Sequence, residues 1–82
     1  MKEVEVAEKI KHILVDKLGL AETEITLDAN LVKDLGVDSL DYAELVMEFE
    51  QTFDIRIPDS DAEQLDTIDD AINYIHKKAN SQ

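Results

Sequence analysis

Residues 36–53 read GVDSLDYAELVMEFEQTF and decide the fold of this chain. Asp38 is a residue type that commonly caps a helix, and Asp41 follows three positions later, as the acidic residue of a capping box does. The stretch therefore predicts a helix that runs from about Ser39 to Phe53. Its first residue is a serine that stands between two carboxylates, at the point where a loop becomes a helix.

The predicted helix carries two apolar stripes. The stripe expected to face the core has helical spacing and consists of Tyr42, Leu45, Val46, Phe49 and Phe53. A second stripe on a different side consists of Leu40, Ala43 and Met47, with Asp41, Glu44 and Glu48 beside it. Apolar groups that lie outside the core and are framed by carboxylates are typical of a partner site. Single exposed apolar residues are also common on proteins, so an interpretation without function stays open.

The segment before this helix divides into another helix and a long loop. Apolar residues recur at helical spacing from Val6 to Leu18, and Gly19 is placed to end the run, so a helix is predicted over residues 3–18. Residues 19–37 show no sustained period, and a loop this long in a small domain is commonly functional. We expect isolated apolar residues to hold it over the helices, with a short turn near residues 31–34. These anchors are Leu20, Ile25, Leu27, Leu31 and Leu35.

The segment after the central helix begins with a short extended stretch. Ile55 and Ile57 flank Arg56, and Pro58 ends the stretch. Asp59 is placed to cap a short helix through residue 64. Two apolar residues of this region are expected to face inward, namely Ala62 and Leu65.

A last helix is predicted from the cap residue Thr67, with Asp70 at its third position. Lys77 and Lys78 suit the negative end of its dipole. Its core stripe consists of Ile68, Ala71, Ile72 and Ile75. The sum is an all-α fold, a small bundle of three principal helices plus one short helix, with a long loop between the first and second helices. At this length we expect one domain over residues 1–82.

Composition limits the partners. The chain has 82 residues, no cysteine and a formal net charge of -12. Between Asp34 and His76 its one basic residue is Arg56. This balance argues against nucleic acid and anionic membranes, which need a basic footprint. An acidic surface can steer basic protein partners, or it can serve solubility alone. The sequence gives no sign of a stable oligomer, so we expect a monomer.

The location is predicted from two further features. No apolar run approaches the ~20 residues needed to span a bilayer. The first residues, MKEVEV, are too charged for a secretory signal. Both features fit a cytoplasmic protein.

The sequence allows three interpretations of Ser39. A catalytic nucleophile needs a base within hydrogen-bond reach, yet the histidines, His12 and His76, lie near opposite ends of the chain, so an enzyme is not expected. A plain first-turn serine needs no function. A modification acceptor uses every local feature, because a helix N-terminus suits an attached phosphate and the acidic surroundings can recruit a basic modifying enzyme.

A metal site is not expected. Residues 59–64 begin like a calcium-binding loop, but Gln64 stands where such a loop has its glycine.

Taken together, these residues resemble an acyl carrier protein of the fatty-acid-synthase type. The strongest match is LGVDSLD at residues 35–41, followed by ELVM at residues 44–47. Further matches follow at Phe53, at IPD in residues 57–59, at Ala62 and at AINYI in residues 71–75. The resemblance covers essentially the whole chain, and the offsets between the motifs make it more specific than the serine motif alone.

The resemblance implies a role for each matching residue. Ser39, preceded by Asp38, would carry 4′-phosphopantetheine through a phosphodiester, installed from coenzyme A by a phosphopantetheinyl transferase. The thiol of this arm would hold acyl groups as thioesters and so supply the sulfur that the chain lacks. The face that docks basic-surfaced acyl-processing enzymes would consist of Leu40, Asp41, Glu44, Met47 and Glu48. The resemblance thus implies a carrier in fatty acid biosynthesis.

Two alternatives to that pathway stay open. One is a specialised carrier for a polyketide, nonribosomal or D-alanyl pathway. The other is a carrier-like interaction subunit that is not modified.

The resemblance also implies a pocket for the acyl chain between the helices. Its candidate residues are Tyr42, Leu45, Val46, Phe49, Ala62, Leu65 and Ile72. Tyr42 departs from the common pattern, in which a smaller residue is more usual. One hypothesis is that its ring narrows the pocket and favours short or unusual acyl groups. The alternative is that Tyr42 lies at the pocket mouth with its hydroxyl in water.

Overall fold

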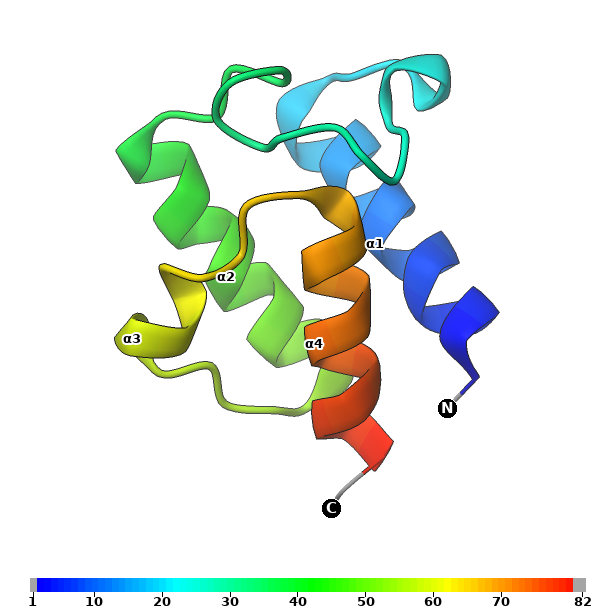
Figure 1. Cartoon of the computed structure of the whole chain (residues 1–82), viewed down its shortest axis with the longest axis vertical. Coiled ribbons are helices and arrows are strands. Elements are labelled where there is room, and N and C mark those ends of the chain that lie inside the picture. Colours follow the sequence, from blue (N-terminus) through cyan, green and yellow to red (C-terminus); the bar gives the residue numbers. More distant parts are fainter. Residues whose placement is uncertain (1, 81–82) are drawn as a thin grey trace.

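A computed structural model describes residues 2–80 as a helical bundle without a strand in that range (Figure 1). The helices are α1 (Glu3–Leu18), α2 (Ser39–Phe53), α3 (Asp59–Ala62) and α4 (Ile68–Asn80), and a single 3-10 turn spans Glu22–Glu24. The predicted all-α fold of three long helices and one short helix is confirmed. No helix within residues 2–80 is long and apolar enough to cross a membrane.

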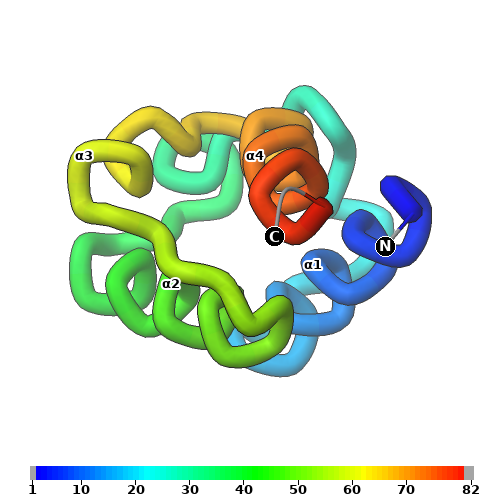
Figure 2. Tube along the Cα trace, turned by 90° about the horizontal axis from the view of Figure 1, so that it is seen from below, coloured from blue at the N-terminus to red at the C-terminus, as the bar shows by residue number. Residues whose placement is uncertain are grey.

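The three long helices enclose one hydrophobic core. α1 packs against both α2 and α4, whereas α3 lies at the side of the bundle farthest from α1 (Figure 2). Within residues 2–80 no polar or charged side chain is buried. The largest fully buried side chains are Phe49, Ile10, Leu14, Leu31, Ile68, Ile72, Ile75 and Val6.

Local signals set the ends of the long helices as predicted. Gly19 ends α1 in the left-handed conformation at φ 67°, and its N–H donates to the Val15 carbonyl at 3.0 Å. A capping box starts α4, because the Thr67 Oγ1 accepts from the Asp70 N–H at 3.1 Å and the Asp70 carboxylate accepts from the Thr67 N–H at 3.1 Å.

The loop over residues 19–38 is held mostly as expected, with one correction. Ile25 and Leu31 are buried, but Leu27 is 56% exposed, so its prediction as an anchor was wrong. The backbone explains this, because the Leu27 carbonyl accepts from the Asp69 N–H at 2.9 Å and the Ala29 carbonyl accepts from the Ile68 N–H at 3.1 Å. This stretch is therefore fastened to the start of α4 by its backbone, and Ala29 enters the core in place of Leu27.

The short helix α3 needs two corrections. Pro58 occupies the N-cap position, so Asp59 is the first helical residue and not its cap. The helix ends at Ala62, because the next amides turn back over three residues, with Leu65 N–H donating to the Ala62 carbonyl at 3.2 Å. The extended stretch before it is as predicted, since Ile55 and Ile57 are buried while Arg56 between them is exposed.

Candidate functional site

Ser39 is an exposed residue held at a fixed point of the surface. It is the first residue of α2, and the carboxylate of Asp38 caps that helix by accepting from the Asp41 N–H at 2.9 Å. On the loop side Val37 is buried, and its N–H donates to the Leu31 carbonyl at 3.0 Å. Gly36 takes a φ of 71°, which an L side chain rarely adopts. The hydrogen-bonded turn and the capped helix start thus place Ser39 at the surface.

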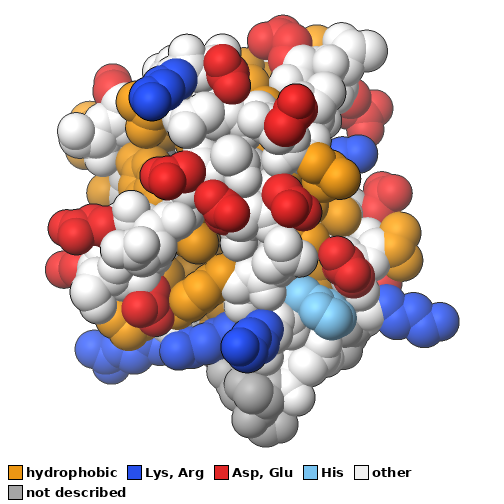
Figure 3. Space-filling model, in the orientation of Figure 1, with side chains coloured by type: hydrophobic (Ala, Val, Ile, Leu, Met, Phe, Trp, Pro, Cys, Tyr) orange, Lys and Arg blue, Asp and Glu red, His pale blue; other side chains and the backbone are white. Residues whose placement is uncertain are grey.

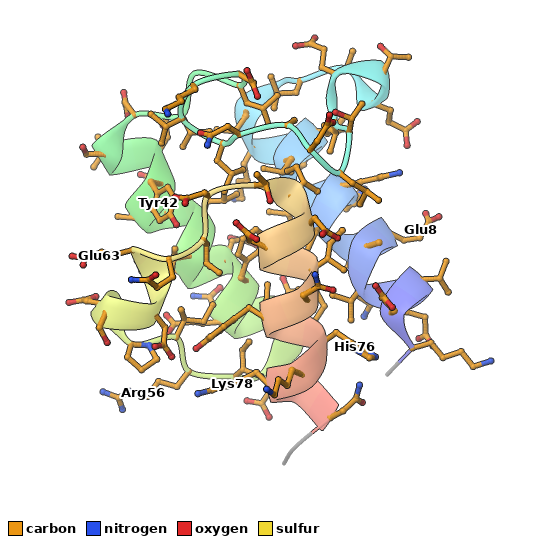
Figure 4. The ribbon with its side chains drawn as sticks, viewed as in Figure 1. Glu8, Tyr42, Arg56, Glu63, His76 and Lys78 are labelled. Atoms are coloured by element: carbon orange, nitrogen blue, oxygen red, sulfur yellow. The ribbon has the colours of Figure 1, made fainter. Side chains whose placement is uncertain are left out.

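Neither histidine lies close enough to Ser39 to act as its base. His12 lines a hollow together with Glu48 and Thr52 of α2, which lie about 13 Å and about 20 Å along the helix from Ser39. His76 lies near the end of α4, whereas Ser39 is at the start of α2, and Figures 1 and 4 place these at opposite ends of the bundle. Neither imidazole can take a proton from the Ser39 hydroxyl.

A groove opens next to Ser39. Its volume is about 1550 Å³, and it runs between one side of α2 and the segment of residues 55–63 that contains α3. Ser39 and Asp38 line one end, and Glu50 and Gln51 line α2 further along. The groove therefore begins where a group attached to Ser39 would begin.

The predicted pocket residues fall into two sets. Tyr42, Val46 and Ala62 line the groove and are partly buried. Leu45, Phe49, Leu65 and Ile72 are buried and do not line it. Sequence reasoning missed Val32, which is 57% exposed on the loop yet borders the same groove. No period in the loop marks Val32, so the signal for it exists only in the folded chain.

Tyr42 joins α2 to the segment that follows α3. Its hydroxyl donates toward two backbone carbonyls, those of Ala62 and of Leu65, the latter at 3.0 Å. Figure 4 shows the side chain pointing from α2 toward that segment. Burial of the ring, and next the charge of Asp66, raise the pKa of the Tyr42 phenol. The alternative in which this hydroxyl lies in water was wrong.

A carboxylate holds the same segment further along α2. Glu50 Oε2 accepts from the Ile57 N–H at 2.8 Å. From the other side, the Tyr74 hydroxyl of α4 donates to Asp61 of α3 at 2.6 Å. Sequence reasoning gave neither Tyr74 nor Glu50 a role, because these bonds join residues 13 and 7 positions apart across different elements.

The second apolar stripe of α2 is exposed to solvent on the outer face of the helix. Leu40 is 71% exposed and Met47 is 57% exposed. Asp41 and Glu44 lie between them along the helix, and Glu48 forms an ion pair with Lys17 of α1 at 3.6 Å. The stripe thus stands on the surface as predicted, although Glu48 is already partly neutralised.

Charge is distributed unevenly over the molecule. Figure 3 shows carboxylates spread over the face that carries α4, and several Lys and Arg side chains gathered at its lower end. Arg56 and Lys78 lie at that lower end in Figure 4. The start of α2, where Ser39 is the first helical residue, lies toward the opposite end of the bundle.

The comparisons with known proteins agree with this geometry. Residues 8–75 match the family described as a phosphopantetheine attachment site. An acyl carrier protein of Amoebophilus asiaticus (strain 5a2) is 49% identical over 74 residues, which are 90% of this chain and 92% of that protein. This chain therefore belongs to the acyl carrier proteins, carriers whose cofactor is 4′-phosphopantetheine.

Proposed function

We propose that Ser39 is the attachment residue and that the chain carries acyl groups as thioesters on the arm. The observation that carries this proposal is the exposed Ser39 hydroxyl at the capped start of α2, beside a groove. When bound, 4′-phosphopantetheine supplies a thiol on a flexible arm. The structure fits this group, because the hydroxyl is accessible and the positive end of α2 favours the phosphate.

This chain takes a passive part in the attachment. Ser39 Oγ would form the phosphodiester bond as the pyrophosphate bond of coenzyme A breaks, with adenosine 3′,5′-bisphosphate as the leaving group. Neither His12 nor His76 is near enough to take the Ser39 proton. The transferase must therefore supply the base, and we propose that the carrier has no catalytic activity of its own. Asp38 acts as a positioning residue, since its cap fixes the first turn of α2.

Acyl-processing enzymes are proposed to dock on the outer face of α2. Exposed Leu40 and Met47 offer apolar contacts, and Asp41, Glu44 and Glu48 offer negative charge. Charge complementarity of this kind speeds encounter without requiring tight binding, which suits a carrier that moves between enzymes. The partners are then enzymes with basic surfaces, the phosphopantetheinyl transferase included.

Fatty acid biosynthesis is the pathway proposed for this carrier. The support is the acidic α2 after the serine and the similarity to an acyl carrier protein over 90% of the chain. Service to a polyketide, nonribosomal or D-alanyl pathway uses the same chemistry at Ser39. The cytoplasmic location, the monomer and the single domain over residues 1–82 stay predictions.

Intact-protein mass tests the attachment. The protein is incubated with coenzyme A and a broad-specificity transferase, with Ser39→Ala as the variant and Ser60→Ala as a matched control, because Ser60 is an exposed helical serine of α3. One phosphopantetheine should appear on the wild type and on Ser60→Ala, and none on Ser39→Ala. A folded wild type that gains no mass beside an active transferase would instead support the unmodified interaction subunit.

Charge reversal tests the docking face. Glu44→Lys should slow arm transfer at low salt by roughly tenfold, and added salt should shrink the difference. Glu22→Lys makes the same charge change on an exposed residue of the 3-10 turn, in the loop between α1 and α2, and should leave the rate near that of wild type. Equal slowing by both variants would reduce the effect to net charge and overturn the proposed face.

A further inference from the structure

Tyr42 stands where the groove beside Ser39 meets a second hollow. The first hollow is the groove between α2 and residues 55–63, and the second is lined by Asn30, Lys33, Leu65 and Asp66. Tyr42, Val32 and Glu63 line both. The Tyr42 ring is thus a wall between them, and its hydroxyl holds that wall in place through the carbonyls of Ala62 and Leu65.

Hydrogen bonds hold α2 to the segment around α3 at two points. Tyr42 makes the contact near Ser39, and Glu50 makes the one further along α2, where it accepts from the Ile57 N–H. The two ties are about 12 Å apart along α2. Val46 is the partly buried residue of α2 on the groove between them. The opening left to an entering chain is therefore short and is bounded at both ends.

Entry past Tyr42 carries a cost that entry into the outer groove does not. A chain that passes Tyr42 to reach buried Leu65 displaces the ring and separates the hydroxyl from both carbonyls. These groups are partly buried, and an unpaired polar group in such a place is unfavourable. A chain that lies along Val46 and the exposed Met47 breaks no hydrogen bond.

We propose that Tyr42 is a specificity-determining clasp, which confines the acyl chain to the outer groove so that this carrier shelters short acyl groups and leaves long ones exposed. The clasp rests on the proposed function in that its cargo is an acyl chain attached at Ser39. Its action depends on the hydroxyl and on the ring separately. The hydroxyl holds α2 to the segment around α3, and the ring fills the space between Ser39 and Leu65.

The absence of cysteine from the sequence allows a test that needs no transferase. In Ser39→Cys the new thiol is the single reactive sulfhydryl, and thiol-reactive linkers of the length of the arm are coupled to it with butyl, octyl or tetradecyl ends. The same series is made with Tyr42→Phe, which removes the hydroxyl and keeps the ring, and with Tyr42→Thr, which removes both. The midpoint of urea unfolding and the NMR signal of the Leu65 backbone amide are recorded for each protein.

With Tyr42 in place, the butyl end should raise the unfolding midpoint and the longer ends should add nothing further. In Tyr42→Phe the midpoint should rise further with the octyl end, and in Tyr42→Thr with the tetradecyl end, each with a shift of the Leu65 amide signal. A midpoint that climbs with chain length equally in all three proteins would overturn the clasp. Failure of the transferase to modify Ser39 would overturn the proposed function instead, because the cysteine series reports on the clasp alone.

Discussion

Two regions of this carrier are held together in different ways. The bundle of α1, α2 and α4 is held by apolar packing, with Phe49, Ile10 and Ile72 almost inaccessible to solvent. The α3 segment, residues 54–67, has no buried residue within Asp59–Ala62. It is anchored by the side chains of Ile55, Ile57 and Leu65 and is tied by the hydrogen bonds of Tyr42, Glu50 and Tyr74.

This contrast indicates which part of the carrier is able to open. Apolar burial is non-directional and is shared by three helices, so the bundle yields only when the whole fold does. A few hydrogen bonds at the edge of the molecule break locally at a smaller cost. The groove beside Ser39 lies on this boundary. One of its walls is α2, which belongs to the bundle, and the other is the α3 segment, which the hydrogen bonds hold in place.

The largest effect is expected from the bundle. Phe49→Ala removes a side chain that is 1% exposed and should lower the free energy of unfolding by about 3–5 kcal/mol, measured by urea titration. Met47→Ala is the matched control in the same helix, because Met47 is exposed, and it should change stability by no more than about 0.5 kcal/mol. Similar losses in both variants would mean that α2 does not support the core in this way.

The next effect is expected where the two regions meet. Thr67→Ala removes the side-chain half of the capping box that starts α4 and should cost about 1 kcal/mol in a thermal or urea melt. Thr52→Ala is its control, since Thr52 is exposed inside α2, where alanine is the better helix former. The contrast fails if Thr52→Ala destabilises the protein as much as Thr67→Ala does.

A smaller effect is expected from the α3 segment alone. Tyr74→Phe removes the donor to Asp61 and should cost roughly 1 kcal/mol, most of it local. Hydrogen exchange should therefore quicken at the amides of Ala62 and Glu63, which belong to α3 and its end, while the amide of Ile75 in the core keeps its protection. Faster exchange at all three sites would show that α3 and the bundle open as one unit.

The sequence predicts the bundle far better than it predicts the ties. Helical spacing and cap residues locate α1, α2 and α4, because those signals act within a few residues of the chain. The position of Ser39 follows from the same local signals. The bond from Tyr42 to Leu65 crosses 23 positions, and the groove has one wall from α2 and the other from residues 55–63. Such contacts depend on how segments pack, which no local period encodes.

Leu27 shows the same limit from the other side. Its hydrophobicity predicts burial, yet its backbone carbonyl is bound to the first turn of α4 and its side chain is left in solvent. A backbone hydrogen bond decided the orientation, and composition carries no signal for that.

The finest distinction concerns the two tyrosines that tie the α3 segment. Burial and the bond to Asp61 raise the pKa of Tyr74 from 10.0 to about 12, and burial followed by the charge of Asp66 raises the pKa of Tyr42. Because the chain has two tyrosines and no tryptophan, phenolate absorbance reports them cleanly. Tyr42→Phe leaves Tyr74 as the single phenol, and Tyr74→Phe leaves Tyr42.

The direction of the pH effect follows from which state holds the proton. The unfolded chain loses a tyrosine proton near pH 10, whereas folded Tyr74 keeps its proton until about pH 12. The stabilising contribution is thus complete below pH 10 and is lost as the pH rises through that window. Stability of the wild type should fall there more steeply than that of Tyr74→Phe. A phenol in Tyr42→Phe that titrates at its ordinary pKa would mean that Asp61 does not hold Tyr74, and α3 would then be tied to α2 alone.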